Sequence, residues 1–238
     1  MSGSHAERRK HMTQKLFKEF FLVIVSFGVI VLALLISWLA SIELPDFNNF
    51  ENRDIANSTK IYDRTGKIVL YNIHDNVRRT AIPFEDISPY IRQATISIED
   101  AHFYEHYGFR PTSFIRAAIA NALSGGYSQG GSTIDQQVIK NALLTREKTI
   151  SRKLKEIILS IKLDHELPKD TILQIYLNES PYGGTIYGVE EASLMYFGKH
   201  AKEVTLTEAA YLAAMPQAPT YYSPYGKHRD ELEKRKSD

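Results

Sequence analysis

The chain of 238 residues contains no cysteine, which excludes a disulfide framework and any metal site built on thiolates. It also lacks an excess of charge of either sign, because 29 lysine and arginine residues are matched by 28 aspartate and glutamate residues. This balance gives no reason to expect nucleic-acid binding, and any cationic site must be local. A hydrophobic content of 43% is enough for a core, and the length allows one domain plus an appendage.

The longest stretch without a charged residue runs from Phe20 to Ile42 and contains 23 residues. A helix of this length is about 34 Å long, whereas the hydrocarbon core of a bilayer is about 30 Å thick. Basic residues precede the stretch and acidic residues follow it, so the positive-inside rule places the N-terminus in the cytoplasm. The small residues Ala40 and Ser41 leave a cleaved signal peptide as the alternative to an uncleaved anchor.

We therefore predict a single-pass protein of the cytoplasmic membrane, with the part of the chain that follows the membrane segment outside the cytoplasm. The predicted segments are a basic cytoplasmic N-terminus over 1–19, a transmembrane helix over 20–42, a polar stalk over 43–59 and a domain over 60–238. Two β-prone runs around a turn predict a β-hairpin at about 60–73. Apolar periodicity and boundary residues predict a mainly α-helical remainder, with helices over 91–107, 109–123, 149–167, 169–178, 206–215 and 227–238.

The first motif that carries chemistry lies at the end of the predicted helix 91–107. On a helix Glu99, Phe103 and His106 share one face with Asp100 beside them, so a carboxylate, an aromatic ring and an imidazole can line a cleft. A carboxylate with apolar neighbours has a raised pKa and can act as a general base or acid near neutral pH. The alternative is a solvated acidic helix end with Phe103 in the core.

The second motif follows a glycine-rich segment over 124–131, which lacks the spacing of a nucleotide-binding P-loop. Ser132 and Thr133 can cap the helix that follows. That helix carries a dense polar set suited to sugar hydroxyls and phosphate oxygens, namely Gln136, Gln137, Lys140 and Asn141. The preceding helix, predicted over 109–123, is apolar on one face and suits either the protein core or a bilayer interface.

The third motif contains Arg152, Lys153 and Glu156 within a basic stretch from Lys140 to Lys162. Arginine binds diphosphate oxygens in a bidentate manner and lysine acts as a point charge, so this stretch suits a bound diphosphate. The alternative is a solvated face with a surface ion pair between Arg152 and Glu156. Glu156 can also orient a basic residue or act as a second carboxylate beside Glu99 in glycosyl transfer.

In order and spacing the three motifs resemble successive signatures of the peptidoglycan glycosyltransferases, the transglycosylase domain of class A penicillin-binding proteins and of monofunctional transglycosylases. The matching motifs are Glu99-Asp100-x-x-Phe103-x-x-His106-x-Gly108, Gly131-Ser132-Thr133-Ile134-x-Gln136-Gln137-x-x-Lys140-Asn141 and Arg152-Lys153-x-x-Glu156. Similar segments at 169–178, 187–190, 196–199, 206–210 and 216–219 extend the resemblance from about Thr59 to the end. Asp135 departs from the family, which usually has a threonine there.

The resemblance implies a lysozyme-like helical domain that polymerises lipid II into glycan strands, with inversion at the anomeric carbon and release of undecaprenyl diphosphate. It implies that Glu99 is the general base and that Glu156 is the second catalytic carboxylate. The residues implied to contact the substrate are Asp100, Phe103, His106, Ser132, Thr133, Gln136, Gln137, Lys140, Asn141, Arg152 and Lys153. No cofactor is certain, and the sequence leaves open whether Mg²⁺ or Mn²⁺ shares the charge of the diphosphate.

The expected partners are lipid II, the growing glycan strand, membrane lipid and other proteins of cell-wall synthesis, and no nucleic acid is expected. Two other classes of protein are compatible with the sequence. A membrane-anchored peptidoglycan hydrolase also uses a glutamate in a helical cleft, but it has no use for several cations. A non-catalytic cell-wall scaffold would use the polar motifs only for capping and as surface.

Overall fold

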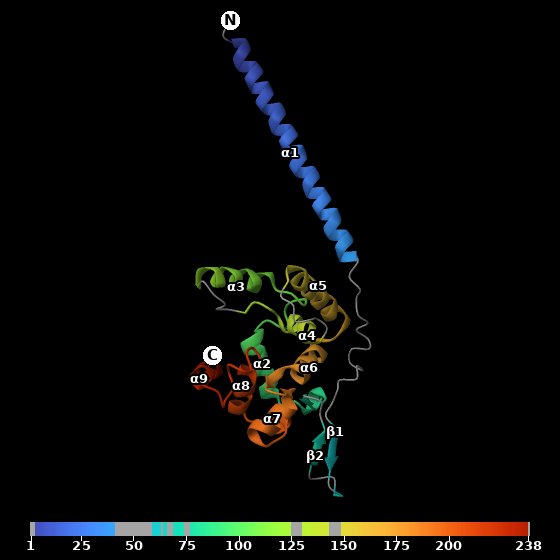
Figure 1. Ribbon diagram of the computed structural model, residues 1–238, viewed down its shortest axis with the longest axis vertical. Coiled ribbons are helices and arrows are strands. Elements are labelled where there is room, and N and C mark those ends of the chain that lie inside the picture. Colours follow the sequence, from blue (N-terminus) through green and yellow to red (C-terminus); the bar gives the residue numbers. More distant parts are fainter. Residues whose placement is uncertain are drawn as a thin grey trace. The chain divides into compact units, whose positions relative to one another are not determined.

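The computed structural model describes residues 3–40, 59–62, 64–65, 69–73, 77–124, 130–142 and 149–237 (Figure 1). Within these ranges most of the secondary structure is helical, which confirms the predicted mainly α class. The chain divides into two compact units, Met1–Pro45 and Asp46–Asp238.

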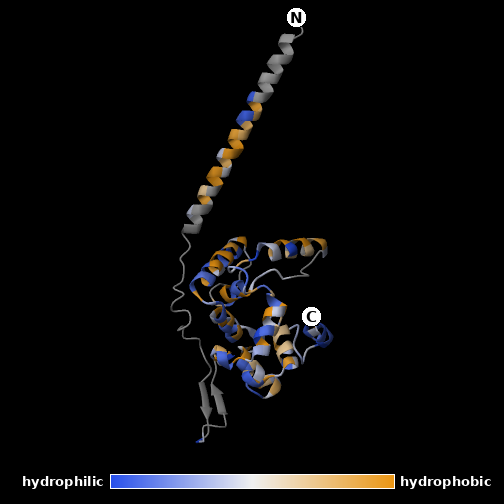
Figure 2. Cartoon of the chain, turned by 180° about the vertical axis from the view of Figure 1, so that it is seen from behind, coloured by the Kyte–Doolittle hydropathy of each residue, from blue (hydrophilic) through white to orange (hydrophobic). Residues whose placement is uncertain are grey.

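Among the described residues of the first unit there is one helix, α1 (Gly3–Ala40), which covers most of the predicted N-terminus over 1–19 and of the predicted membrane segment over 20–42. The helix continues through the basic residues because residues 4–19 contain neither glycine nor proline, and because Lys15 and Glu19 form an i,i+4 pair at 3.9 Å. Large apolar side chains are exposed along its middle (Figure 2). In the described part of the chain we find no helix whose length and apolar character together suffice to cross a membrane.

The transmembrane helix predicted over 20–42 is therefore not found among the described residues, and its last two positions lie outside them. The predicted stalk over 43–59 also lies outside, except for Thr59, with which a strand begins.

The second unit contains the predicted β-hairpin and a small sheet that was not predicted. Antiparallel strands β1 (Thr59–Tyr62) and β2 (Val69–Ile73) confirm the hairpin. The second sheet has the strand order β3-β5-β4, with β3 (Arg78–Arg79) parallel to β5 (Ile186–Tyr187) and β4 (Pro181–Gly183) antiparallel to it.

The helices of the second unit follow the predicted pattern with one large exception and one addition, the helix over Val189–Phe197, which was not predicted. They are the 3₁₀ turns at Phe84–Asp86 and Ala201–Glu203 and the helices α2 (Pro89–Glu99), α3 (Pro111–Ser124), α4 (Ile134–Ala142), α5 (Ile150–Glu166), α6 (Lys169–Glu179), α7 (Val189–Phe197), α8 (Leu206–Ala214) and α9 (Arg229–Ser237). Thr149 caps α5 by accepting a hydrogen bond from the Arg152 backbone N–H at 3.1 Å. Pro168 then separates α5 from α6, as predicted.

The exception is α2, which ends at Glu99 rather than continuing to residue 107. Asp100 leaves the helical conformation, with φ −157° and ψ 75°, and its side chain binds groups that are distant in sequence. Gly108 has φ 71°, and a Cβ atom there would lie 2.2 Å from the Ser160 carbonyl oxygen. Gly108 is therefore needed where this loop packs against α5, and it does not cap a helix that continues from α2.

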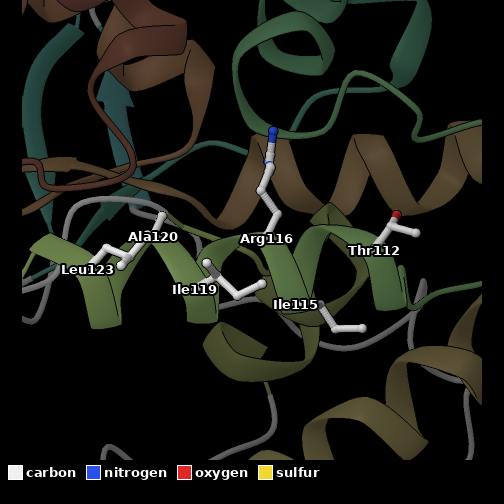
Figure 3. Close-up of a pocket in the computed structure, with 6 residues that line it drawn as sticks. All are labelled: Thr112, Ile115, Arg116, Ile119, Ala120 and Leu123. Carbon is white, nitrogen blue, oxygen red and sulfur yellow. The ribbon is translucent and has the colours of Figure 1, made fainter.

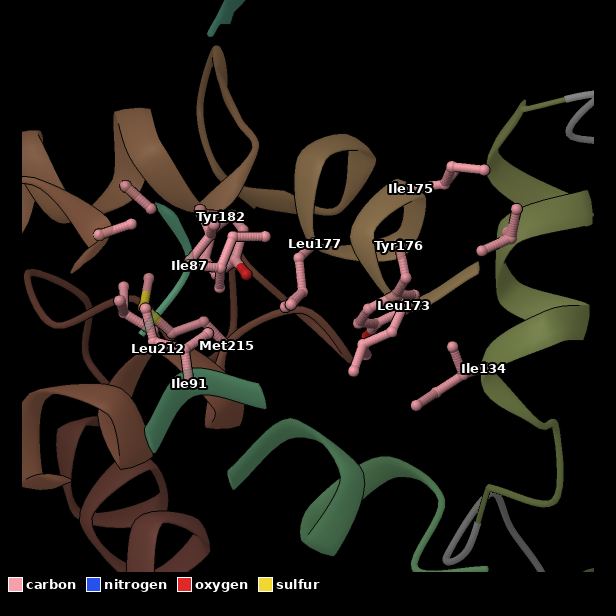
Figure 4. Close-up of a cluster of buried hydrophobic side chains, with 14 of the residues drawn as sticks. Ile87, Ile91, Ile134, Leu173, Ile175, Tyr176, Leu177, Tyr182, Leu212 and Met215 are labelled. Carbon is pink, nitrogen blue, oxygen red and sulfur yellow. The ribbon is translucent and has the colours of Figure 1, made fainter. Parts of the chain in front are cut away.

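The hydrophobic core lies where α2 packs on α8 and where α4 packs on α5 and α6. Figure 4 shows Ile87, Ile91, Leu212 and Met215 together on one side of this core, with Ile134 of α4 facing the side chains of α6. This packing fixes the C-terminal end of α2 close to α4 and brings the first two motifs together. The lysozyme-like topology stays a prediction.

Candidate active site

Glu99 is the last residue of α2, and its carboxylate is buried, with 6% of the side chain exposed. The Gln137 side-chain amide donates a hydrogen bond to Oε2 at 2.7 Å, and the Arg235 guanidinium contacts Oε1 at 2.8 Å. A carboxylate oxygen has two lone pairs, so each oxygen can still accept one further hydrogen bond. The carboxylate is thus held in one orientation from two sides and retains the capacity to accept a proton.

The second motif forms the start of α4 through a capping box. Thr133 Oγ1 accepts a hydrogen bond from the Gln136 backbone N–H at 3.2 Å, and Gln136 Oε1 accepts one from the Thr133 N–H at 2.9 Å. Thr133 Oγ1 also donates to the Gly108 carbonyl at 2.7 Å. Both side chains are buried, so Thr133 and Gln136 shape the helix start, and their predicted contact with substrate stays a prediction.

The third motif meets the second at Ser132. Lys153 Nζ donates to Ser132 Oγ at 2.8 Å and forms an ion pair with Glu156. Arg152 lies 3.9 Å from the second oxygen of Glu156, which is buried. The pair between Arg152 and Glu156 is thus not a surface pair. Glu156 contacts both Arg152 and Lys153, which fits the role of orienting basic residues that the sequence left open for it.

Lys140, on α4, connects these two groups of side chains electrostatically. The side chain of Lys140 is exposed, yet desolvation by the surrounding protein lowers its pKa. The positive charges of Lys153 and Arg152 lower the pKa further, whereas the carboxylates of Glu156 and Glu99 raise it. The neighbouring Asn141 is exposed. Lys140 therefore lies within electrostatic reach of the Glu99 carboxylate and of the group formed by Arg152, Lys153 and Glu156.

Three residues of the first motif do not share a helix face with Glu99, because α2 ends before them. Phe103 is buried in the core, which agrees with the alternative that the sequence left open for this residue. The centre of its ring lies 4.5 Å from Lys169 Nζ. Asp100 Oδ2 contacts His106 Nε2 at 2.7 Å and accepts the Ile134 N–H at 3.2 Å. These contacts hold the loop after α2 on the first turn of α4, and substrate binding by Asp100, Phe103 and His106 stays a prediction.

Asp135, the residue that departs from the family pattern, is fully buried in the first turn of α4. Lys169 Nζ lies 3.3 Å from its Oδ1 and also pairs with Asp164. Burial raises the pKa of Asp135 to about 6, although the charges of Lys169 and His106 act in the opposite direction. Asp135 therefore faces the protein interior and does not contact the solvent beside the cations.

A family model described as transglycosylase matches residues 66–238. The chain belongs to the transglycosylase family. It is 40% identical over 192 residues to penicillin-binding protein 1A of Aquifex aeolicus (strain VF5) and 38% identical over 220 residues to penicillin-binding protein 1F of Bacillus subtilis (strain 168). These alignments cover 81% and 92% of this chain but 26% and 30% of the two relatives, so the chain spans less than a third of their length. The matches confirm the predicted family and enzyme class.

The sequence of this transglycosylase gave no indication that Arg235 belongs to the site. Arg235 lies on α9, 136 positions from Glu99, in a helix predicted only as a charged segment. Its Nε donates to the Ala214 carbonyl at 3.1 Å, and the guanidinium lies 5.5 Å from the centre of the Tyr222 ring. Arg235 is thus fixed by α8 and the loop before α9, and it orients the Glu99 carboxylate.

We expect Arg235→Lys to lower the kcat of the transglycosylase about 10-fold and to leave KM nearly unchanged, because one ammonium cannot reproduce a guanidinium held at two points. Arg235→Met should cost more, since it leaves a buried carboxylate with one fewer partner. Steady-state kinetics with thermal unfolding of the same samples measures both effects. If kcat fell equally in the two variants and the melting temperature also fell equally, Arg235 would only stabilise the fold.

The transglycosylase also has an exposed apolar surface on α3. Ile115, Ile119 and Leu123 border a pocket of about 590 Å³ together with Thr112, Arg116 and Ala120 (Figure 3). Ile115 and Leu123 are 56% and 83% exposed. The second motif packs against the same helix, since a Cβ atom on Gly131 would lie 2.8 Å from the Ala117 Cβ. Of the two positions that the sequence left open for this apolar face, the protein core does not apply to Ile115, Ile119 and Leu123, because their side chains are exposed.

Proposed function

We propose that the chain polymerises lipid II into glycan strands. The observation that carries this proposal is the arrangement around Glu99: a buried carboxylate oriented by Arg235 and Gln137, with the cation Lys140 within electrostatic reach. A base and a cationic surface side by side suit a reaction in which a hydroxyl attacks and a diphosphate leaves. The family membership supports the same reaction.

In this mechanism Glu99 removes the proton from the 4-hydroxyl of the acceptor's GlcNAc. The oxygen attacks the anomeric carbon of the donor's MurNAc, the bond from that carbon to the diphosphate oxygen breaks, and the configuration at the carbon inverts. Undecaprenyl diphosphate leaves as an anion, so it needs positive charge more than a proton. Lys140, Arg152 and Lys153 supply that charge, with Glu156 holding the last two in position. A Mg²⁺ or Mn²⁺ ion bound with the diphosphate would add to it.

We place the enzyme at the outer face of the cytoplasmic membrane, with its N-terminus inside. The uncharged run Phe20–Ile42 and the basic residues before it support this location, as do the exposed apolar side chains of α1. The exposed apolar face of α3 suits contact with the bilayer, from which the lipid-linked donor would enter the site.

The double variant Ile115→Glu/Ile119→Glu tests the role of α3. Both side chains are exposed, so the fold should tolerate the change, whereas contact with lipid should be lost. We expect polymerisation of lipid II in liposomes to fall about 10-fold or more, because each buried apolar side chain contributes about 1.5–3 kcal/mol. Polymerisation of a water-soluble donor with a short prenyl chain should change little. Equal losses with both donors would contradict a membrane-facing role.

Incubation of the detergent-solubilised full chain with lipid II tests the proposed reaction directly. Polymeric glycan together with stoichiometric undecaprenyl diphosphate supports the transferase. Cleavage of finished glycan without polymerisation would instead identify a peptidoglycan hydrolase. A folded chain that does neither, in liposomes as well as in detergent, would favour the cell-wall scaffold.

A further inference from the structure

A compact group of metal-ligating side chains lies in the interior beneath the proposed active site. Asp100, His106 and Asp135 each offer one ligand atom, and these three atoms lie within 4.8 Å of one another. They come from two segments that the reaction needs: the loop that follows Glu99 and the first turn of α4, which carries Gln137. The group is separate from Lys140, Arg152 and Lys153, which we assign to the diphosphate.

Two buried polar atoms of this group have no hydrogen-bond partner. Asp135 Oδ2 is one, on a side chain with no exposed surface, and His106 Nδ1 is the other, on a side chain that is 8% exposed. Buried polar atoms in folded proteins are almost always satisfied, and each one that is not carries its full desolvation cost. Asp135 Oδ2 is an oxygen of a type that metal ions bind. Asp100 Oδ2 lies 2.7 Å from His106 Nε2, so Nε2 is the ring nitrogen that can share an ion with Asp100 and Asp135, whereas Nδ1 lies on the other side of the ring.

The charges in this region also do not balance. The carboxylates of Asp135 and Asp164 share one ammonium, that of Lys169, which also lies over the Phe103 ring. Asp100 pairs with the His106 ring, so with Asp135 and Asp164 ionised one excess negative charge remains in the interior. Burying uncompensated charge is costly, and a divalent cation would cancel this excess.

We propose that Asp100, His106 and Asp135 bind a divalent transition-metal ion, with Zn²⁺ as the preferred ion. One imidazole nitrogen and two carboxylate oxygens form a ligand set that Zn²⁺ accepts, whereas Mg²⁺ prefers oxygen ligands alone. The ion joins the loop after Glu99 to the start of α4 and so fixes Glu99 relative to Gln137. Its role is structural. Because the site needs the carboxylate of Asp135, a chain with threonine at this position would lack it.

Calorimetric titration of the chelator-treated full chain with Zn²⁺, at about pH 7.5 where the ligands are deprotonated, tests the proposal. We expect one Zn²⁺ per chain, a higher melting temperature with Zn²⁺, and no comparable effect of Mg²⁺. Asp135→Asn, which preserves the shape of the side chain, should weaken Zn²⁺ binding at least about 10-fold. Asp135→Thr, the residue usual in the family, should do the same and serves as the second variant if Asp135→Asn does not fold.

The matched control is Glu105→Gln, which changes the exposed pair between His102 Nδ1 and Glu105 Oε2 at 2.6 Å on the same loop. It should leave Zn²⁺ binding unchanged. Zinc X-ray absorption of the wild-type chain provides a test that needs no variant and should show nitrogen and oxygen ligands at about 2.0–2.2 Å, including one imidazole. Absence of Zn²⁺ binding by the wild-type chain, binding as tight as wild type in both Asp135 variants, or a spectrum without imidazole would each overturn the proposal.

Discussion

Glu99→Gln is expected to reduce glycan polymerisation from lipid II by about 10²- to 10⁴-fold, the usual contribution of a general base. The glutamine side chain has the same shape and can still accept a hydrogen bond from Arg235, while the Gln137 amide can turn to offer its oxygen. The variant therefore loses the proton acceptor and keeps most of the contacts around it. Product formation from lipid II, followed by separation of glycan chains, measures the loss.

The loss should lie in kcat, because the binding groups Lys140, Arg152 and Lys153 are unchanged. Glu105→Gln is again the control, since it removes an exposed carboxylate six positions away and should retain wild-type activity. Thermal unfolding shows whether each variant is folded. A folded Glu99→Gln chain that polymerises lipid II within threefold of the wild-type rate would rule out Glu99 as the base and direct attention to Glu156.

The boundaries of α5 show what local sequence can predict. Thr149 caps the helix and Pro168 follows it, and both signals act through groups within a few residues of the helix ends. The predicted helix over 149–167 therefore differs from α5 by one residue at each end. The order and spacing of the motifs predicted the family in the same direct way, because spacing along the chain is itself the signal.

The end of α2 shows what local sequence cannot predict. Residues 91–107 contain neither glycine nor proline, so the local pattern favours a helix that continues past Glu99. Asp100 instead binds the Ile134 N–H and His106, and these tertiary contacts outweigh helix propensity. As a result, the side chains of Phe103 and His106 do not lie on one helix face with Glu99, contrary to what the sequence predicts.

Arg235 was missed for a related reason. Its contact with Glu99 joins residues 136 positions apart, and a single sequence carries no signal for such a pair. Its position depends on α9 packing against α8, which in turn packs on α2. Asp135 is the opposite case: the sequence marked it as a departure from the family, but only the fold shows that it is buried beside Lys169.

Lys140→Glu is expected to lower glycan polymerisation by about 10²- to 10³-fold or more, the cost of removing one preorganised group that stabilises charge in the transition state. The new carboxylate would also repel the departing diphosphate and add to the negative charge of Glu99 and Glu156. The Lys140 side chain is exposed, so the fold should tolerate the change. A hydrolase acting on neutral glycan would keep its activity, so glycan cleavage and lipid II polymerisation are to be measured on the same samples.

Lys140→Arg is the matched control, because it keeps the positive charge, and its pH profile tests the cause of the loss. Desolvation lowers the pKa of Lys140, so the lysine loses its charge at a lower pH than an exposed lysine, whereas arginine stays charged. Since kcat/KM reports groups of the free enzyme, its alkaline limb should fall at a higher pH in Lys140→Arg than in the wild type. If kcat/KM fell at the same alkaline pH in both proteins, a group other than Lys140 would be responsible for the loss of activity at high pH.

If Lys140→Glu also kept its activity, the charge of Lys140 would not stabilise the leaving diphosphate, and Arg152 and Lys153 would have to do so alone.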